Sequence, residues 1–309
     1  MGFGPMLCVA FLAVWGGAVS ATHETLANML MVNAAVQLVL FALVAVLPFI
    51  RTGRMSYVDI AWPFGVALIG LQIAVMGDGE VVRRLCVAGV YLLIGLRMGI
   101  GALAMARSTG VIFKTEFPRY VYRRMQLSGQ SESRVHFHIL SEIMAQGLAN
   151  ASVLAIPGFM IAVNGQSKIH PLEIAGICIW IIAYVLESAA DLQKMKFIAN
   201  NRGGVCNVGL WRYSRHPNYF SEWLVWTGIV IAAVPSLMSL YGTEPTYVSA
   251  ALGIGDAGAS LMMYITLVYL TGAIPAEYYS VRKRADYKRY QETTNMFFPW
   301  LPRKSPSNQ

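Results

Sequence analysis

The stretch GLWRYSRHPNYFSE, residues 209–222, carries side chains that could bind a nucleotide. Arg212 and Arg215 have the planar fork that grips phosphate oxygens through two parallel hydrogen bonds. Asn218 and Glu222 follow one helical turn apart, so an amide and a carboxylate share one side of a helix. They can hydrogen-bond the amide or ribose groups of a ligand. The stretch therefore predicts a nucleotide pocket.

The predicted helix before this stretch has a polar face. Glu187, Asp191 and Lys194 fall on one side of that helix. An ion pair between Asp191 and Lys194 at the lipid headgroups is the alternative interpretation. The glycine-rich loop NNRGGVCNVG, residues 200–209, lets backbone N–H groups approach an anion and adds Arg202. Helix face and loop together favour an anionic ligand.

The elements that position these groups must be membrane helices. The 309 residues are 56% hydrophobic and 13% charged, against about 25% charged in an average soluble domain. The apolar runs have the length of helical spans rather than of barrel strands. We predict an all-α polytopic bundle with eight spans, at about 3–20, 26–50, 57–76, 85–106, 138–163, 171–190, 219–240 and 248–276.

Basic residues indicate the orientation. Most of the 24 Lys and Arg residues lie in connections after even-numbered spans, which predicts cytoplasmic termini. The net charge of +8 follows from this bias and does not indicate nucleic-acid binding. The long polar connections share that side, so we expect the working surface to be cytoplasmic.

We predict four regions: a transmembrane hairpin (1–56), substrate-side helices (57–170), a cofactor-binding region (171–303) and a tail (304–309). The four cysteines are scattered without metal-ligand or redox spacing, so no metal site is expected. Charged groups within spans are costly and face a protein interior, a partner or a water-filled cavity. Those in the predicted spans or at their ends are Asp59, Arg97, Glu142, Glu187, Glu222 and Glu277.

Three motifs carry a resemblance to a known family. They are E-x3-D-x-Q-K from Glu187 to Lys194, GLWRYSRHPNYFSE, and IPAEYYSVRKRADYKRYQETTNMFFPWLP in the tail. Together they resemble the steroid 5-alpha-reductase-like membrane proteins, closest to a bacterial-type branch of unknown function. The similarity is dense over about residues 180–303. Weaker pieces, such as YVDIAWPFG and TEFPRYVYRR, extend it through most of the chain.

The resemblance implies a seven-helix core that holds NADPH and delivers hydride to an electron-poor C=C of a lipid. By motif, Asp191, Tyr213, Asn218 and Glu222 would contact the cofactor, with Arg215 and Tyr279 beside it. The second span lacks the Gln-Glu motif of established steroid reductases, so the substrate is less defined than the cofactor. The full set expected to bind NADPH is Glu187, Asp191, Lys194, Arg202, Tyr213, Arg215, His216, Asn218, Tyr219, Glu222 and Tyr279.

A related family, the isoprenylcysteine carboxyl methyltransferases, uses a similar RHP-x-Y run for S-adenosylmethionine. That cofactor has a sulfonium and a carboxylate but no phosphate. Arg202, Arg212 and the helix that carries Asp191 favour the phosphorylated dinucleotide. A non-enzymatic lipid-binding protein with a degraded site is the third hypothesis.

Reduction of an enone also needs a donor that stabilises the enolate oxygen. Candidates are Tyr120 and Glu116 of TEFPRY, Asp59 of YVDIAW, and His216. Each has a structural alternative: Asp59 could pair with Arg97, Glu116 with Arg119, and His216 could cap the seventh helix.

The leading hypothesis is an NADPH-dependent reductase of a hydrophobic enone, steroid-like or isoprenoid-like, in lipid or steroid metabolism. It would be a monomer in a bacterial inner membrane, or in the endoplasmic reticulum of a eukaryote.

Overall fold

The computed structural model describes residues 3–303, and these form helices with no β-strand among them. The predicted all-α polytopic bundle is confirmed. The first elements are α1 (Phe3–Ala18), α2 (Glu24–Phe41), η1 (Ala42–Val46), α3 (Leu47–Thr52), α4 (Val58–Met76), α5 (Val81–Thr109), α6 (Pro118–Gln126), α7 (Glu132–Ala151) and α8 (Ile156–Ala162). The others are α9 (Pro171–Asn200), η2 (Gly209–Arg212), α10 (Pro217–Tyr241), α11 (Thr246–Ile265), η3 (Thr266–Leu270), α12 (Ala273–Lys283) and α13 (Tyr287–Thr293).

Seven segments of the described chain are long and apolar enough to cross a membrane, so this is an integral membrane protein. They are Glu24–Thr52, Val58–Met76, Val81–Thr109, Glu132–Ala162, Pro171–Asn200, Pro217–Tyr241 and Thr246–Lys283. The remaining predicted span corresponds to α1, whose 16 residues fall short of the roughly 20 that span a bilayer. The π-helical turn η1 joins α2 to α3 without a break, whereas Thr271 and Gly272 interrupt the helix between η3 and α12.

The chain forms two compact units. The first comprises Met1–Ile174 with Val230–Ala259, and the second comprises Ala175–Ile229 with Ser260–Gln309. All the predicted cofactor residues therefore fall in the second unit, together with the end of α9, the start of α10, α12 and α13. The predicted proton donors of the connection before α7 fall in the first.

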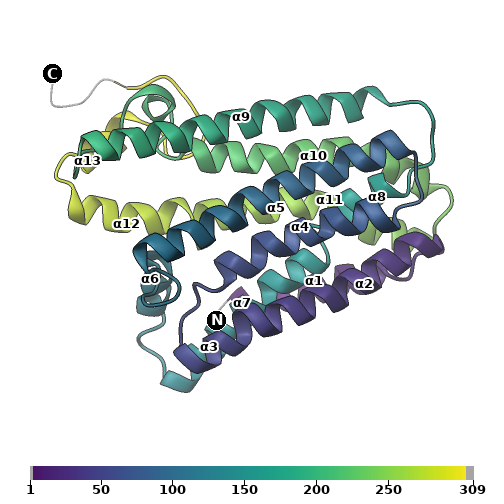
Figure 1. Cartoon of the computed structure of the whole chain (residues 1–309), viewed down its shortest axis with the longest axis horizontal. Coiled ribbons are helices and arrows are strands. Elements are labelled where there is room, and N and C mark those ends of the chain that lie inside the picture. Colours follow the sequence, from purple (N-terminus) through teal and green to yellow (C-terminus); the bar gives the residue numbers. More distant parts are fainter. Residues whose placement is uncertain (1–2, 304–309) are drawn as a thin grey trace. The chain divides into compact units, whose positions relative to one another are not determined.

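Small residues let the helices of the first unit approach closely. Figure 1 shows α4 and α5 side by side, and they are in contact. A Cβ added at Gly95 of α5 would lie 2.4 Å from the backbone nitrogen of Ala67. Glycine is required there because two backbones meet without side chains between them.

The fourth long span is interrupted in its interior. Helix α7 ends at Ala151, and residues 152–155 leave the α-helical pattern before α8 begins. The Tyr91 hydroxyl supports this break by donating to the Leu154 carbonyl oxygen at 2.7 Å and accepting from the Gly158 N–H at 3.2 Å. The break is thus held by a side chain from α5.

Buried amides stabilise the approach to the break. Asn33 Nδ2 donates to the carbonyl oxygen of Asn150 at 2.9 Å, and Asn150 Nδ2 donates to Gln37 Oε1 at 3.2 Å. All three residues are at most 1% exposed. Because unpaired polar groups are costly in an apolar interior, these bonds fix how α2 packs against α7.

Candidate functional site

Two glycines shape the loop between α9 and α10. Gly203 and Gly209 have φ of +86° and +57°, in the left-handed region that favours glycine. A Cβ at Gly209 would also lie 2.4 Å from Gln193 Oε1. That oxygen accepts the Leu210 N–H at 2.9 Å. Gly209 therefore lets η2 dock on the last turns of α9.

Trp211 fixes the same loop to α9 from the other side. Its indole N–H donates to the Ala190 carbonyl oxygen at 2.9 Å, and the ring is buried. The ammonium of Lys194 lies 4.2 Å from the centre of this ring, a cation–π distance. Lys194, predicted to bind the cofactor, is thus held against Trp211.

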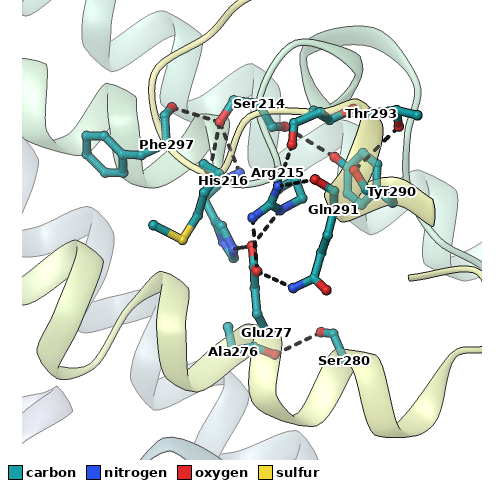
Figure 2. A network of polar contacts seen from close by, with 12 residues as sticks. Ser214, Arg215, His216, Ala276, Glu277, Ser280, Tyr290, Gln291, Thr293 and Phe297 are labelled. Carbon is teal, nitrogen blue, oxygen red and sulfur yellow. Dashed lines mark hydrogen bonds and ion pairs between the residues drawn. The ribbon is translucent and has the colours of Figure 1, made fainter. Parts of the chain in front are cut away.

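The carboxylate of Glu277, on α12, binds side chains from two segments, the residues just before α10 and helix α13. Arg215 Nε and Nη2 donate to its two oxygens at 2.7 and 3.1 Å, and Gln291 Nε2 on α13 donates at 2.6 Å. His216 Nε2 lies 3.1 Å from Glu277 Oε1. We call these four residues the Glu277 cluster; Figure 2 shows them converging.

Arg215, predicted to grip a phosphate, is buried in the structure. Its side chain is 10% exposed. Its Nη1 donates to the carbonyl oxygens of Gln291, at 3.1 Å, and Thr294. The reason is that Glu277, distant in sequence, compensates the buried charge. Most of the guanidinium N–H groups are therefore directed at protein oxygens.

His216, which directly precedes α10, contacts both Glu277 and Tyr219. Its ring hydrogen-bonds Glu277 and stacks on Tyr219 with centroids 5.3 Å apart and planes 3° from parallel. Burial lowers the pKa of His216, while the contact with Glu277 acts in the opposite direction. The neutral imidazole is therefore favoured by its surroundings.

The C-terminal segment completes the second unit. Ser214 Oγ donates to the Phe297 carbonyl oxygen at 2.8 Å, and the Trp300 N–H donates to the Tyr213 carbonyl oxygen at 2.9 Å. The Tyr290 hydroxyl donates to the Ser214 carbonyl oxygen at 3.2 Å. Figure 2 shows the loop and this segment meeting around Ser214 and Tyr290. The tail motif and the RHPNY motif thus form one structure.

Asp191 and Asn218 meet between α9 and α10. Asn218 Nδ2 donates to Asp191 Oδ1 at 3.1 Å. This bond fixes the orientation of the amide, because a carboxylate can only accept. The other amide atom, Asn218 Oδ1, is buried and has no hydrogen-bond partner within residues 3–303. An oriented acceptor is thus available to a ligand.

The other predicted cofactor residues lie at different depths. Glu187 and Glu222 are buried, at 5% and 9% exposure, and Tyr219 and Tyr279 are half-buried. Arg202 and Tyr213 are exposed. Tyr213 lines an open cavity of about 380 Å³ together with Pro299, Trp300 and Leu301. The structure thus joins Asp191 to Asn218 and Tyr219 to His216, and leaves Arg202 at the surface.

A family profile described as "Protein of unknown function (DUF1295)" matches residues 48–294. The chain belongs to this family. The match runs from α3 to the end of α13, so it covers every predicted site residue of the DUF1295 chain. Neither a curated protein nor a solved structure matches it.

Three of the four predicted proton donors of this DUF1295 protein, Asp59, Glu116 and Tyr120, lie in its first unit, and His216 lies in the second. Asp59 Oδ1 accepts from Arg119 Nη2 at 2.6 Å and from the Tyr120 hydroxyl at 3.1 Å. Burial raises the pKa of Tyr120, so its proton is retained at neutral pH. The structural alternative for Asp59 was an ion pair with Arg97. In the structure Asp59 forms its ion pair with Arg119.

Glu116, a further predicted donor, lies against the backbone before α4. Its carboxylate accepts the N–H groups of Met55 and Ser56 at 2.7 and 3.0 Å, and also the Ser56 hydroxyl. The suggested pair with Arg119 is not formed, because Arg119 binds Asp59. Glu116 thus secures the turn that precedes α4.

Sequence reasoning missed parts of the site. Glu277 was noted as a costly charge but not placed in the site, and Gln291 was not singled out. The available signal was that both lie in the tail motif and that a carboxylate in an apolar span needs a partner. Asp256, a further carboxyl within a span, was overlooked altogether.

Proposed function

We propose that the second unit binds NADPH and that the protein is a membrane reductase, delivering hydride to the C=C of a hydrophobic enone lipid. The supporting observation is the Asp191–Asn218 pair with its free, buried Asn218 Oδ1. An acceptor of this kind suits the N–H₂ of a carboxamide or a ribose hydroxyl. Both groups occur in a nicotinamide dinucleotide.

Two further features suit the rest of the dinucleotide. Arg202 and Arg212 are exposed on the loop and can reach phosphate oxygens. The aromatic rings of Tyr213 and Trp300 border the open cavity and offer a surface for a flat base. S-adenosylmethionine also has a flat base but has no phosphate for Arg202 and Arg212, so NADPH is the favoured ligand.

The sequence prediction that Tyr120, Glu116 and Asp59 supply the proton concerns the first unit and is proposed separately from the cofactor site. Tyr120 holds its proton at neutral pH, and Asp59 accepts a hydrogen bond from it. If Tyr120 turns from Asp59 toward the substrate, its hydroxyl can donate to an enolate oxygen as charge develops. We place both termini and the polar connections in the cytoplasm, where NADPH is available. The lipid is steroid-like or isoprenoid-like, and a monomer suffices for these roles.

The test compares ligands on the purified protein. NADPH at 100 times its dissociation constant should stabilise the fold by about 2.7 kcal/mol, seen as a rise in Tm. Asn218→Ala should weaken NADPH binding by about 1 to 3 kcal/mol, whereas Asn207→Ala in the exposed part of the loop should not. Enone-dependent oxidation of NADPH would establish the activity. Stabilisation by S-adenosylmethionine and not by NADPH would overturn the proposal in favour of a methyltransferase. Stabilisation by neither ligand would overturn it in favour of a lipid-binding protein.

A further inference from the structure

Asp256 lies in the middle of α11, inside the first unit, and is 3% exposed. Its Oδ1 has no hydrogen-bond partner anywhere in residues 3–303. No ion pair to this residue is formed in the described part of the chain, and no charged side chain there acts on its carboxyl group. It therefore differs from Glu173, Asp59, Glu142 and Glu277, each of which pairs with an arginine.

The surroundings of Asp256 are tightly packed. A Cβ at Gly255 would lie 2.4 Å from Ile156 Cδ1, and one at Gly258 would lie 3.3 Å from Val153 Cγ1. Val153 lies in the break and Ile156 begins α8, so α11 packs against both sides of the interruption. These contacts place α11 against the break on either side of Asp256 in sequence.

The titratable side chain that faces Asp256 is Tyr91, on α5, which lies within its electrostatic reach. The single proton of the Tyr91 hydroxyl is donated to the Leu154 carbonyl oxygen. The other packed elements add no charge: α8 carries no titratable residue, and on α1 the titratable group is Cys8, whose Sγ donates to Ser141 O at 3.4 Å. The protein thus gives this carboxyl no donor.

A bare carboxylate in an apolar interior is strongly unfavourable, so such a group is neutralised by something it binds. The C-terminal end of α7 meets the break, and the dipole of a helix favours positive charge at that end. Broken membrane helices hold small cations in this way in transporters.

We propose that Asp256 and the adjoining break between α7 and α8 form a binding site for a small monovalent cation, a proton or Na⁺. The ion neutralises the carboxyl group and allows α11 to pack against the break. This site is separate from the proposed NADPH site and does not depend on it.

Infrared spectroscopy distinguishes the two ions. A bound proton gives the carbonyl stretch of a neutral carboxylic acid at pH 7 in Na⁺-free buffer, and Asp256→Asn should abolish the part due to one carboxyl. Asp78→Asn, the same change at an exposed position, should leave the band unchanged. If Na⁺ is the ion, this component disappears when NaCl is added, NaCl raises Tm above the value in equimolar KCl, and Asp256→Asn removes that difference.

Two results would overturn the site. The first is that the wild-type protein shows neither a protonated carboxyl band nor a Na⁺-specific rise in Tm. This outcome is decided on the wild-type protein alone. Alternatively, Asp256→Asn could leave both signals unchanged. If Asp256→Asn does not fold, Asp256→Glu keeps the carboxyl group, and the proposal requires that it change the frequency of the band or the size of the Na⁺ effect.

Discussion

Arg215 and Glu277 form a two-pronged ion pair, Nε to Oε1 at 2.7 Å and Nη2 to Oε2 at 3.1 Å, across 62 positions of sequence. Both side chains are about nine-tenths buried. The pair ties the start of α10 to α12, while the other guanidinium nitrogen binds the carbonyl oxygens of Gln291, in α13, and of Thr294, just after it. The geometry before the first turn of α10 therefore depends on a carboxylate in the C-terminal region.

Glu277→Gln should destabilise the protein strongly, because it leaves the charge of Arg215 buried without a counter-charge. Removing one partner of a buried pair costs about 3 to 5 kcal/mol, which a fall in Tm without ligand would report. Glu142→Gln is the matched control, since its pair with Arg123 is more exposed and should matter less. Equal falls in Tm for the two substitutions would show that the Glu277 cluster stabilises the protein no more than the Arg123–Glu142 pair does.

Gly209→Ala should destabilise the protein more than Gly203→Ala. Both positions have positive φ, so each alanine carries backbone strain of about 1 to 2 kcal/mol. Only at Gly209 does the added Cβ also meet Gln193, since nothing lies within 4 Å of the one at Gly203. Thermal unfolding of the two variants gives the comparison, and the reverse order would contradict the close docking of η2 on α9.

Stability should decrease as the pH falls below about 6.5, the ordinary pKa of histidine. Burial lowers the pKa of His216 in the fold, so the unfolded chain takes up the proton more readily. The contribution of a neutral His216 is therefore present above that pH and is lost as the pH falls toward the lowered folded-state pKa, by at most about 1.4 kcal/mol per pH unit. Tm measured at pH 7.5 and 5.5 should change less in His216→Asn, and an identical change would refute the assignment.

Glu222→Gln tests the ligand of the second unit. Glu222 lies one turn after Asn218 and is 9% exposed. If it accepts hydrogen bonds from NADPH, the substitution should lower NADPH affinity by roughly 1 to 3 kcal/mol, with a smaller effect on ligand-free Tm. Glu292→Gln, at an exposed position, provides the control. An equal loss of Tm with and without NADPH would make Glu222 a structural residue.

The orientation in the membrane can be tested by thiol labelling in a variant without the four natural cysteines. Ser128→Cys and Lys288→Cys should resist an impermeant reagent in intact cells, because both lie in connections predicted to be cytoplasmic. Gly165→Cys, on the opposite side, should react. The structure favours these positions because all three are exposed and a Cβ at Gly165 meets nothing within 4 Å. Labelling of the first two would reverse the topology and the route of NADPH.

Local sequence patterns were sufficient for the membrane helices and for part of the site. Apolar runs of helical length locate the spans, since the cost of burying a backbone in lipid depends on length and hydropathy. Spacing also placed Asn218 and Glu222 one turn apart on α10, and it identified the glycine-rich loop before them.

The partners of the charged residues were decided by tertiary structure alone. The sequence predicts Arg215 as a phosphate ligand, but in the structure it binds Glu277. Asp59 binds Arg119 rather than Arg97. Asp256 resembles any other costly carboxyl in the sequence, and only packing shows that it is left without a partner. The physical reason is that helix periodicity and hydropathy act over a few turns, whereas the energy of a buried charge depends on which distant helix lies against it.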